Sequence, residues 1–522
     1  MSLDQVDKSV QSTKTSGMTQ PVGIDTDGKL WTTPGGGSGE VSSVNGKTGD
    51  VTLDAEDVGA LPNTTAVPTK TSDLTNDSGF LTQHQSLDAY RTSSEQDAID
   101  AGKIGKSAQA EKTVNMTQPV GVDSDGKLWV SEFSGTAKRY GYRREKSNSN
   151  PSDRIVYMYD AVGMIPAYMD FENDEFVWGD WKKFVEEIAR PVMLKSDGTV
   201  DYELDHGDQT KKLDGTESDI EDTSYDGGAM VEFNDSFCWI KRWEDARYEY
   251  VVFSNQEIDS DYHAYAHTGS DGKVKSAFYW GMFGGINIDS KMKSIGSGTP
   301  MVHQTREAEI TCAKALGEGW HTIFKSGWDY ISDLLTLICK NDNSQEAYGV
   351  GYSASTNTSV IANGTTNSKG CFWGDDTGLN SVKTLWIENY WGNYWQAIAG
   401  LVCDTDGTVK AKMFPPYCDT PVSDPDFTEY SEIGNVSGSL NGFADSEQMN
   451  EFGYFPKSIN GSGTTYMCDK FYYDMTQATL KYGLVGGIYS HENGCGSRGV
   501  SVHVAANYGG DYMRGSRPAY IS

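Results

Sequence analysis

The chain has 522 residues and a formal net charge of −31 at pH 7. Nucleic acids and anionic membranes attract basic surfaces, so this charge argues against both as partners. The sequence has no apolar run near the ~18 residues that a membrane-spanning helix needs. Its first residues also lack the basic and apolar parts of a signal peptide. We therefore expect neither membrane insertion nor ordinary secretion.

The first 137 residues contain an internal repeat. The stretch MTQPVGIDTDGKLW at 18–31 returns as MTQPVGVDSDGKLW at 116–129. In each copy an Asp-Gly pair supplies a turn between alternating apolar residues, which predicts a small hairpin. Such short polar segments bury too little surface to form a core alone. We therefore expect several identical chains to wind together as a rod, with a flexible Gly/Ser linker as the alternative.

Two further units of this region have the sequences VNGKTGDVTLDAEDVGALP (44–62) and LTNDSGFLT (74–82). They resemble the shafts of bacteriophage tail fibres and receptor-binding proteins, which are usually trimers. The resemblance implies a mostly β, fibrous N-terminal shaft over 1–137 in a homotrimer. It also implies attachment of the N-terminus to the phage tail or baseplate, and a location in the virion.

Aromatic and β-branched residues become frequent from residue 138 onward. We expect a compact adaptor domain over 138–220 and a head over 221–522. Asp-Gly pairs recur in both and predict many hairpins. Helix signals occur at 304–319, where Thr305 is a suitable N-cap, and at 326–342, where apolar residues have helical spacing. Two helices among many short strands predict an α+β head in a multidomain chain.

Three landmarks of the head follow one another in a characteristic order. They are GEGWHTIFKSGWDYISDLL (317–335), LWIENYWGNYWQAIAGL (385–401) and a final segment that runs from GLVGGIYSH to GSRPAYIS (483–522). Their order resembles the C-type lectin fold in its formylglycine-generating-enzyme-like form. That family has a core motif of the type Asn-x-x-Gly-Asn-x-x-Glu-Trp; the matching stretch at 389–395 is shorter here and lacks the Glu before the Trp. The matching residues are Asn389, Gly392, Asn393, Trp395, Gly486, Gly487, Gly515 and Arg517.

Within that fold family, the chain resembles the variable proteins of diversity-generating retroelements, many of which are phage receptor-binding proteins. The resemblance implies a hypervariable segment at about 486–514 that binds a bacterial surface receptor, either a protein or a glycan. Glu492 and Met513 are not among the residue types that this diversification produces, so we expect them to be fixed scaffold. The expected ligand-binding residues are Ile488, Ser490, His491, Asn493, Gly494, Gly499, Ser501, His503, Asn507, Tyr508, Gly510 and Asp511.

The stretch GVSVHVA (499–505) alternates in polarity, which predicts a strand with one face in the core. Val500, Val502 and Val504 would point inward, while the residues between them would form the exchangeable face. The Gly-Ser-Arg triplets at 496–498 and 515–517 would be constant flanks. The segment would then be a rigid frame that displays a changeable surface, and a rigid frame loses little entropy on binding.

We expect no catalysis, cofactor or metal. An oxidase of the formylglycine-generating type needs a reactive cysteine pair in its last strands, and Cys495 is alone there. His263 and His267 in DSDYHAYAH could share a face and bind a metal, with a solvated strand face as the alternative. The Asp-x-Asp-Gly units are interpreted as hairpin turns, and a structural calcium stays open without a ligand set.

Other interpretations stay open at this point. The aromatic residues of IENYWGNYW (387–395) either fill the core or form a sugar-stacking platform. All eight cysteines lie after residue 237 without a C-x-x-C pair; buried free thiols are the simplest interpretation, but spacing does not decide against disulfides. The alternative functions are a fixed-specificity bacterial adhesin and a surface-glycan depolymerase, which would need paired carboxylates in a cleft.

Overall fold

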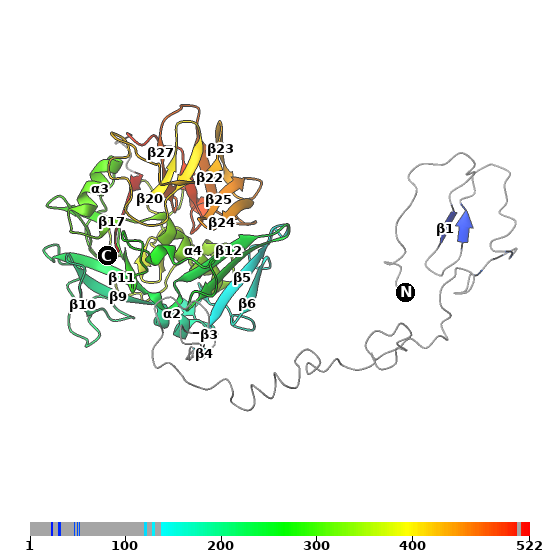
Figure 1. Ribbon diagram of the computed structural model, residues 1–522, viewed down its shortest axis with the longest axis horizontal. Coiled ribbons are helices and arrows are strands. Elements are labelled where there is room, and N and C mark those ends of the chain that lie inside the picture. The colour runs from blue at the N-terminus through cyan, green and yellow to red at the C-terminus, as the bar shows by residue number, and fades with distance from the viewer. Residues whose placement is uncertain are drawn as a thin grey trace. The chain divides into compact units, whose positions relative to one another are not determined.

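The computed structural model describes residues 137–508 and 513–522, together with residues 22–24, 30–32, 46, 50, 52, 120–122 and 128–130 (Figure 1). The chain divides into two units, Met1–Glu132 and Phe133–Ser522, and each is described by itself. The division falls close to the expected end of the shaft at 137. Strands greatly outnumber helices among the described residues, so the coarse expectation of a mostly β protein is confirmed.

Both copies of the N-terminal repeat form an antiparallel two-stranded hairpin. Strand β1 (Val22–Ile24) pairs with β2 (Leu30–Thr32), and β3 (Val120–Val122) pairs with β4 (Leu128–Val130). The register is the same in both copies, because a glycine lies opposite the repeated tryptophan each time. The predicted hairpins are therefore confirmed for their strands. Their Asp-Gly turns lie outside the described residues.

Residues 138–220 do not form a unit apart from the head, so the expected boundary at 220 is wrong. A four-stranded sheet combines strands from both sides of it, in the order β12 (Trp239–Glu244), β13 (Tyr248–Ser254), β5 (Arg139–Glu145) and β6 (Ile155–Tyr159). A six-stranded sheet does the same, in the order β10 (Val200–Glu203), β9 (Ala189–Lys195), β11 (Gly227–Asn234), β14 (Ala277–Gly281), β30 (Pro518–Tyr520) and β17 (Trp320–Thr322). Strand pairing across residue 220 joins adaptor and head into one compact unit.

The third large sheet carries the C-terminal segment. Its order is β22 (Ser431–Asn435), β21 (Thr408–Ala411), β20 (Trp395–Cys403), β27 (Lys481–Val485), β28 (Val500–Val502), β26 (Lys470–Asp474) and β23 (Ser439–Phe443), with β29 (Arg514–Gly515) parallel to β20. Four small hairpins complete the strands in the described part of this unit: β7 (Tyr168–Asp170) with β8 (Glu175–Val177), β15 (Gly285–Ile288) with β16 (Lys291–Ser294), β18 (Lys383–Thr384) with β19 (Ile387–Glu388), and β24 (Ser446–Asn450) with β25 (Gly453–Ser458).

The helices among the described residues are α2 (Lys182–Ile188), α3 (Arg306–Lys314), α4 (Lys325–Cys339) and α5 (Ser344–Tyr348), with the 3-10 turns η4 (Asp235–Phe237), η5 (Tyr265–His267) and η6 (Glu492–Gly494). The two predicted helices are confirmed as α3 and α4. Thr305 is the N-cap of α3, and its side chain accepts a hydrogen bond from the backbone N–H of Ala308. The short helices α2 and α5 were not predicted.

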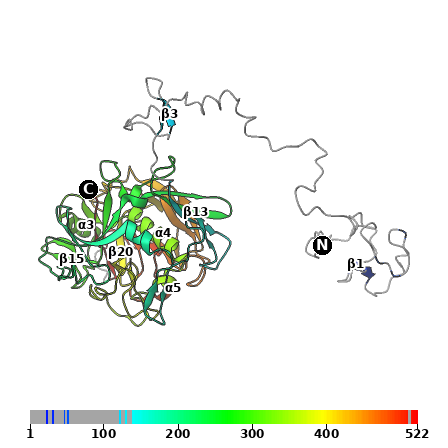
Figure 2. The ribbon, with the colours of Figure 1, turned by 90° about the horizontal axis from the view of Figure 1, so that it is seen from below.

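Helix α4 lies inside the second unit with strands around it, as Figures 1 and 2 both show, and all of its residues are buried. Lys325, Asp329 and Asp333 are spaced four apart, so they share one face of the helix. Lys325 pairs with Asp329, and Asp333 accepts hydrogen bonds from Arg242 and Arg498. Because its charged face finds partners, an amphipathic helix can be enclosed on every side.

The aromatic motif at 387–395 belongs to the core. Tyr390, Trp391, Tyr394 and Trp395 are each no more than 4% exposed. Tyr390 stacks on Trp328 of α4 with ring centroids 4.0 Å apart. The core interpretation is therefore confirmed, and rings this deeply buried cannot serve as a platform for a sugar.

Candidate binding surface

The two Gly-Ser-Arg triplets, one within the C-terminal segment at 496–498 and one after it at 515–517, are held in the core. The Arg517 side chain is completely buried, and its Nε donates to Gln396 Oε1 at 2.6 Å. The remaining guanidinium nitrogens donate to backbone carbonyls of Gly281, Met282, Glu388 and Asn389, at 2.7–3.4 Å. Burial lowers the pKa of Arg517. This arginine joins β14, the aromatic motif and β20, so the second triplet is structural.

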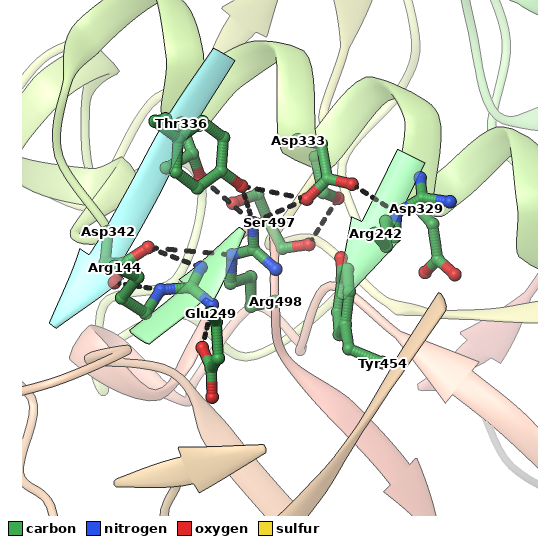
Figure 3. Close-up of polar contacts among 12 residues, drawn as sticks. Arg144, Arg242, Glu249, Asp329, Asp333, Thr336, Asp342, Tyr454, Ser497 and Arg498 are labelled. Carbon is green, nitrogen blue, oxygen red and sulfur yellow. Dashed lines mark hydrogen bonds and ion pairs between the residues drawn. The ribbon is translucent and has the colours of Figure 1, made fainter. Parts of the chain in front are cut away.

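The first triplet is held by a buried polar network (Figure 3). Arg498 Nη2 donates to three acceptors: Asp333 Oδ1 at 2.9 Å, Tyr142 OH at 3.0 Å and Thr336 Oγ1 at 3.2 Å. The guanidinium carbon lies 4.4 Å from the centre of the Tyr454 ring. The backbone N–H of Arg498 donates to Asp469. Side chains from β5, α4 and β25 thus hold the first triplet in place.

The network continues through Arg144, which is also fully buried. Its guanidinium binds both carboxylate oxygens of Asp342, at 2.7 and 2.8 Å, and also contacts Glu249 and Glu447. Burial alone would raise the pKa of Asp342, but the neighbouring arginines outweigh it, so that pKa lies below its usual value. For Glu447 burial prevails and raises the pKa to about 7. These carboxylates are almost completely buried, so they stabilise the frame and do not meet a substrate.

The predicted binding residues occupy very different depths. Tyr508 is 54% exposed, and Asn493 and Asn507 are also exposed. The half-buried residues are Ser490, His491 and His503. The buried residues are Ile488, Gly494, Gly499 and Ser501. The predicted positions Gly510 and Asp511 lie outside the described residues.

Strand β28 does not have an exposed face, which corrects the expectation for residues 499–505. Val500 and Val502 are buried as predicted, but Ser501 between them is 0% exposed. The strand lies between β27 and β26, and its Ser501 hydroxyl donates to the Tyr472 carbonyl at 2.9 Å. Gly499 and Ser501 therefore cannot contact a partner, because both faces of this central strand are covered.

Trp395 underlies the accessible part of the segment. Its ring lies 5.6 Å from His491 and 6.5 Å from His503, centre to centre, and it packs in one apolar cluster with Ile488. Burial lowers the pKa of His491 and of His503 to about 4, so both rings are neutral at pH 7. Residues far apart in the segment thus pack around one buried indole. Tyr508, Asn493 and Asn507 are the exposed residues of the same segment.

Tyr472 of β26 belongs to this region although sequence reasoning did not select it. The His503 ring stacks on Tyr472 with centroids 4.1 Å apart and an interplanar angle of 22°. The same histidine is hydrogen-bonded to Ser501. Nothing in the local pattern of 470–474 signals this contact, because it arises from the parallel pairing of β26 with β28. His503 is therefore partly a packing residue.

The other sequence candidates do not form sites. His267 is buried in the 3-10 turn η5, where its Nε2 bonds to the carbonyls of Phe233 and Asn234. His263 instead pairs with Glu451 at 3.2 Å, so the two histidines do not share a strand face. No group of three metal-binding side chains occurs among the described residues.

Cysteine chemistry is not supported either. All eight cysteines lie in the described part of the chain, and all are free. Cys495 is completely buried, burial raises the pKa of its thiol, and its Sγ donates to the Ile488 carbonyl. A protonated, enclosed thiol is inert. The interpretation as buried free thiols agrees with six of the cysteines, whereas Cys312 and Cys418 are free but only partly buried.

Comparison with known proteins finds no matching family model and no matching curated protein. Within the described ranges, no helix has both the length and the apolar character that crossing a membrane requires.

Proposed function

We propose that the chain is a bacteriophage tail-fibre receptor-binding protein. Its second unit would be a C-type-lectin-like head that attaches the virion to a bacterial surface receptor and has no catalytic role. Its binding surface would be diversified by a retroelement and would consist of the accessible residues between 489 and 508. The resemblance of the shaft units and of the head landmarks to phage proteins supports this proposal.

The observation that carries the proposal is the contrast in burial between the arginines of the two Gly-Ser-Arg triplets and the exposed residues of the same segment. Arg498 and Arg517 are no more than 2% exposed and are hydrogen-bonded within the core, whereas Asn493, Asn507 and Tyr508 of the same segment are exposed. Changes at the exposed positions leave the packing intact, so such a segment tolerates variation. Tyrosine and asparagine also suit adaptable recognition, since they combine ring contact with hydrogen bonding.

A trimer would make weak contacts sufficient. Linking binding sites raises avidity by ~10²–10⁴ over a single site when all can engage together. The homotrimeric shaft therefore belongs to the proposal, because one small and variable surface need not bind tightly alone.

The test combines Asn493→Ala, Asn507→Ala and Tyr508→Ala in the full chain. Adsorption of the labelled protein to cells of the phage's host should be lost while the melting temperature is unchanged. Tyr168→Ala is the matched control, because Tyr168 on β7 is similarly exposed at 49% and lies outside the segment. Undiminished adsorption of the triple variant would refute this surface, and release of products from host glycans would favour a depolymerase instead.

The diversification itself has a separate test in the DNA next to the gene. A near-copy of codons 484–520 that differs almost only at adenines, together with a reverse-transcriptase gene, is the expected result. Their absence would leave a fixed-specificity binder.

A further inference from the structure

The four-stranded sheet of β12, β13, β5 and β6 has one face toward α4 and one face away from it (Figure 1). On the inner face, Tyr142 of β5 and Arg242 of β12 each donate a hydrogen bond to Asp333 of α4. Successive side chains of a strand point to opposite faces. The residues next to these two, Arg143 and Trp243, therefore belong to the outer face. The strands of this sheet contain none of the residues between 489 and 508.

One row of the outer face runs across all four strands. Trp243 of β12 lies opposite Tyr250 of β13, and Tyr250 lies opposite Arg143 of β5. Arg143 in turn lies opposite Val156 of β6. The rings of Trp243 and Tyr250 are stacked, with centroids 4.6 Å apart and an interplanar angle of 2°. All four side chains are at least partly exposed, so two large rings and a guanidinium lie side by side at the surface.

Two arginines on the outer face of β5 each lie over a tyrosine ring. The guanidinium carbon of Arg143 is 4.5 Å from the ring centre of Tyr248, and that of Arg139 is 4.1 Å from the ring centre of Tyr159. The two arginines are four residues apart on one strand, which places them about 13 Å apart on the same face. Stacking on an aromatic ring orients a guanidinium plane. The outer face therefore presents cations whose orientation is set in advance.

The cations of this face differ in whether a carboxylate already neutralises them. Lys241 pairs with Asp261 at 2.7 Å, and Arg247 pairs with Glu145 at 2.9 Å. Within the described residues, Arg143 has neither an ion pair nor a hydrogen bond. Only its Nε is enclosed, so Nη1 and Nη2 are open to solvent. These two nitrogens form a planar fork that matches the two oxygens of a carboxylate.

The rim of this surface decides which anionic partner fits it. The rim carries the carboxylates Glu145, Glu244, Asp245, Asp259 and Asp261. Duplex nucleic acid has a charge about every 1.7 Å along its axis, so this rim repels it. A sugar polymer with separate carboxylates instead brings one charge to Arg143 and hydroxyl groups to the rim. Carboxylates accept hydrogen bonds from hydroxyl groups, so such a polymer matches both parts of the surface.

We propose that this outer face binds an acidic polysaccharide whose sugar rings carry carboxylate groups. One carboxylate of the polymer accepts hydrogen bonds from Nη1 and Nη2 of Arg143. The apolar side of a sugar ring packs on Trp243 and Tyr250, and the rim carboxylates accept hydrogen bonds from its hydroxyl groups. This surface goes beyond the proposed receptor site, because the two have no residue in common.

Binding of the full chain to immobilised polygalacturonate at low salt, measured by biolayer interferometry, tests the proposal. Neutral dextran is the reference polymer and should bind about tenfold more weakly, because it offers no carboxylate to Arg143. Arg143→Gln should weaken the Kd for polygalacturonate about tenfold, as the loss of a hydrogen bond to a charged group does. Trp243→Ala should also weaken it, since it removes ring contact.

Two controls separate this surface from other effects. Arg190→Gln should bind polygalacturonate as the original chain does, because Arg190 lies on another sheet and already has two carboxylate partners. The triple variant of the receptor surface should also bind it normally, so failure of that surface and failure of this one are distinguishable. Arg143→Gln should melt close to the original temperature, since Nη1 and Nη2 have no partner within the chain to lose.

The proposal is overturned if polygalacturonate does not bind, if dextran binds as well, or if Arg143→Gln binds as tightly as the original chain. Equal binding of polyglutamate would show that a carboxylate alone is recognised, which would refute the assignment to a sugar polymer. A smaller assembly of Arg143→Gln in light scattering would mean that a second copy of the chain covers this face, and it would refute the assignment as well.

Discussion

Substitution of Arg498 by methionine tests the claim that the first Gly-Ser-Arg triplet is a structural anchor. Arg498→Met keeps an unbranched apolar side chain but removes a buried charge and three hydrogen bonds. Removing one partner of a buried ion pair costs about 3–5 kcal/mol. Asp333 keeps its bond from Arg242 at 2.8 Å, and the backbone bond to Asp469 also survives. We therefore expect a loss near the lower end, about 3 kcal/mol.

Urea unfolding of the full chain, followed by tryptophan fluorescence, measures this loss. All tryptophans except Trp31 and Trp129 lie in the second unit, so the signal reports on that unit. Arg190→Met is the matched control: its side chain is 42% exposed and pairs with Glu203 and Glu232, and partly exposed pairs contribute little. If Arg498→Met lost no more stability than Arg190→Met, the anchoring role of the network would be refuted.

Three further predictions follow from burial and hydrogen bonding. Ser501→Ala should lower the free energy of unfolding by about 1 kcal/mol in the same assay, because it leaves the Tyr472 carbonyl without this donor; no loss would mean that Ser501 is accessible after all. Glu447 has a pKa of about 7 in the folded state, above its usual value of 4.5. Between pH 4.5 and 7 the unfolded chain loses the proton of this carboxyl while the folded chain keeps it, so the free energy of unfolding falls as the pH rises. Glu447→Gln should flatten that fall in urea titrations across this range, and an unchanged slope would contradict the raised pKa. Alkylation of the native chain should label Cys312 and Cys418 first, since the other six cysteines are buried; mass spectrometry that found early labelling of Cys495 would contradict its enclosed position.

Local features of the sequence predicted several elements correctly. The repeated 14-residue unit has the same alternation in both copies, so the same strand register is found in both. Thr305 caps α3 because an N-cap depends only on the residues beside it. The aromatic motif could be assigned to the core because four large rings within a few residues have too much apolar surface to leave in water.

Long-range pairing decided the features that the sequence did not predict. Alternation shows which side of a strand is apolar, but it does not show what covers the other side. Ser501 is buried because β28 lies between β26 and β27 at the centre of the sheet, where the strands β20, β27 and β28 are buried on both faces. Strand β26 comes from a segment almost thirty residues earlier. The accessible surface was therefore reduced to fewer positions than the polarity pattern suggested.

The sequence by itself determined short elements, their caps and the residues that must leave water, because these depend on neighbours along the chain. Only the tertiary structure decided that residues 138–220 share sheets with the head, that α4 is enclosed on all sides, and that the Ser501 hydroxyl is buried against the Tyr472 carbonyl. Each of these outcomes depends on which distant segments meet, and a charged helix face or a lone hydroxyl acquires its role only when its spatial neighbours are in place.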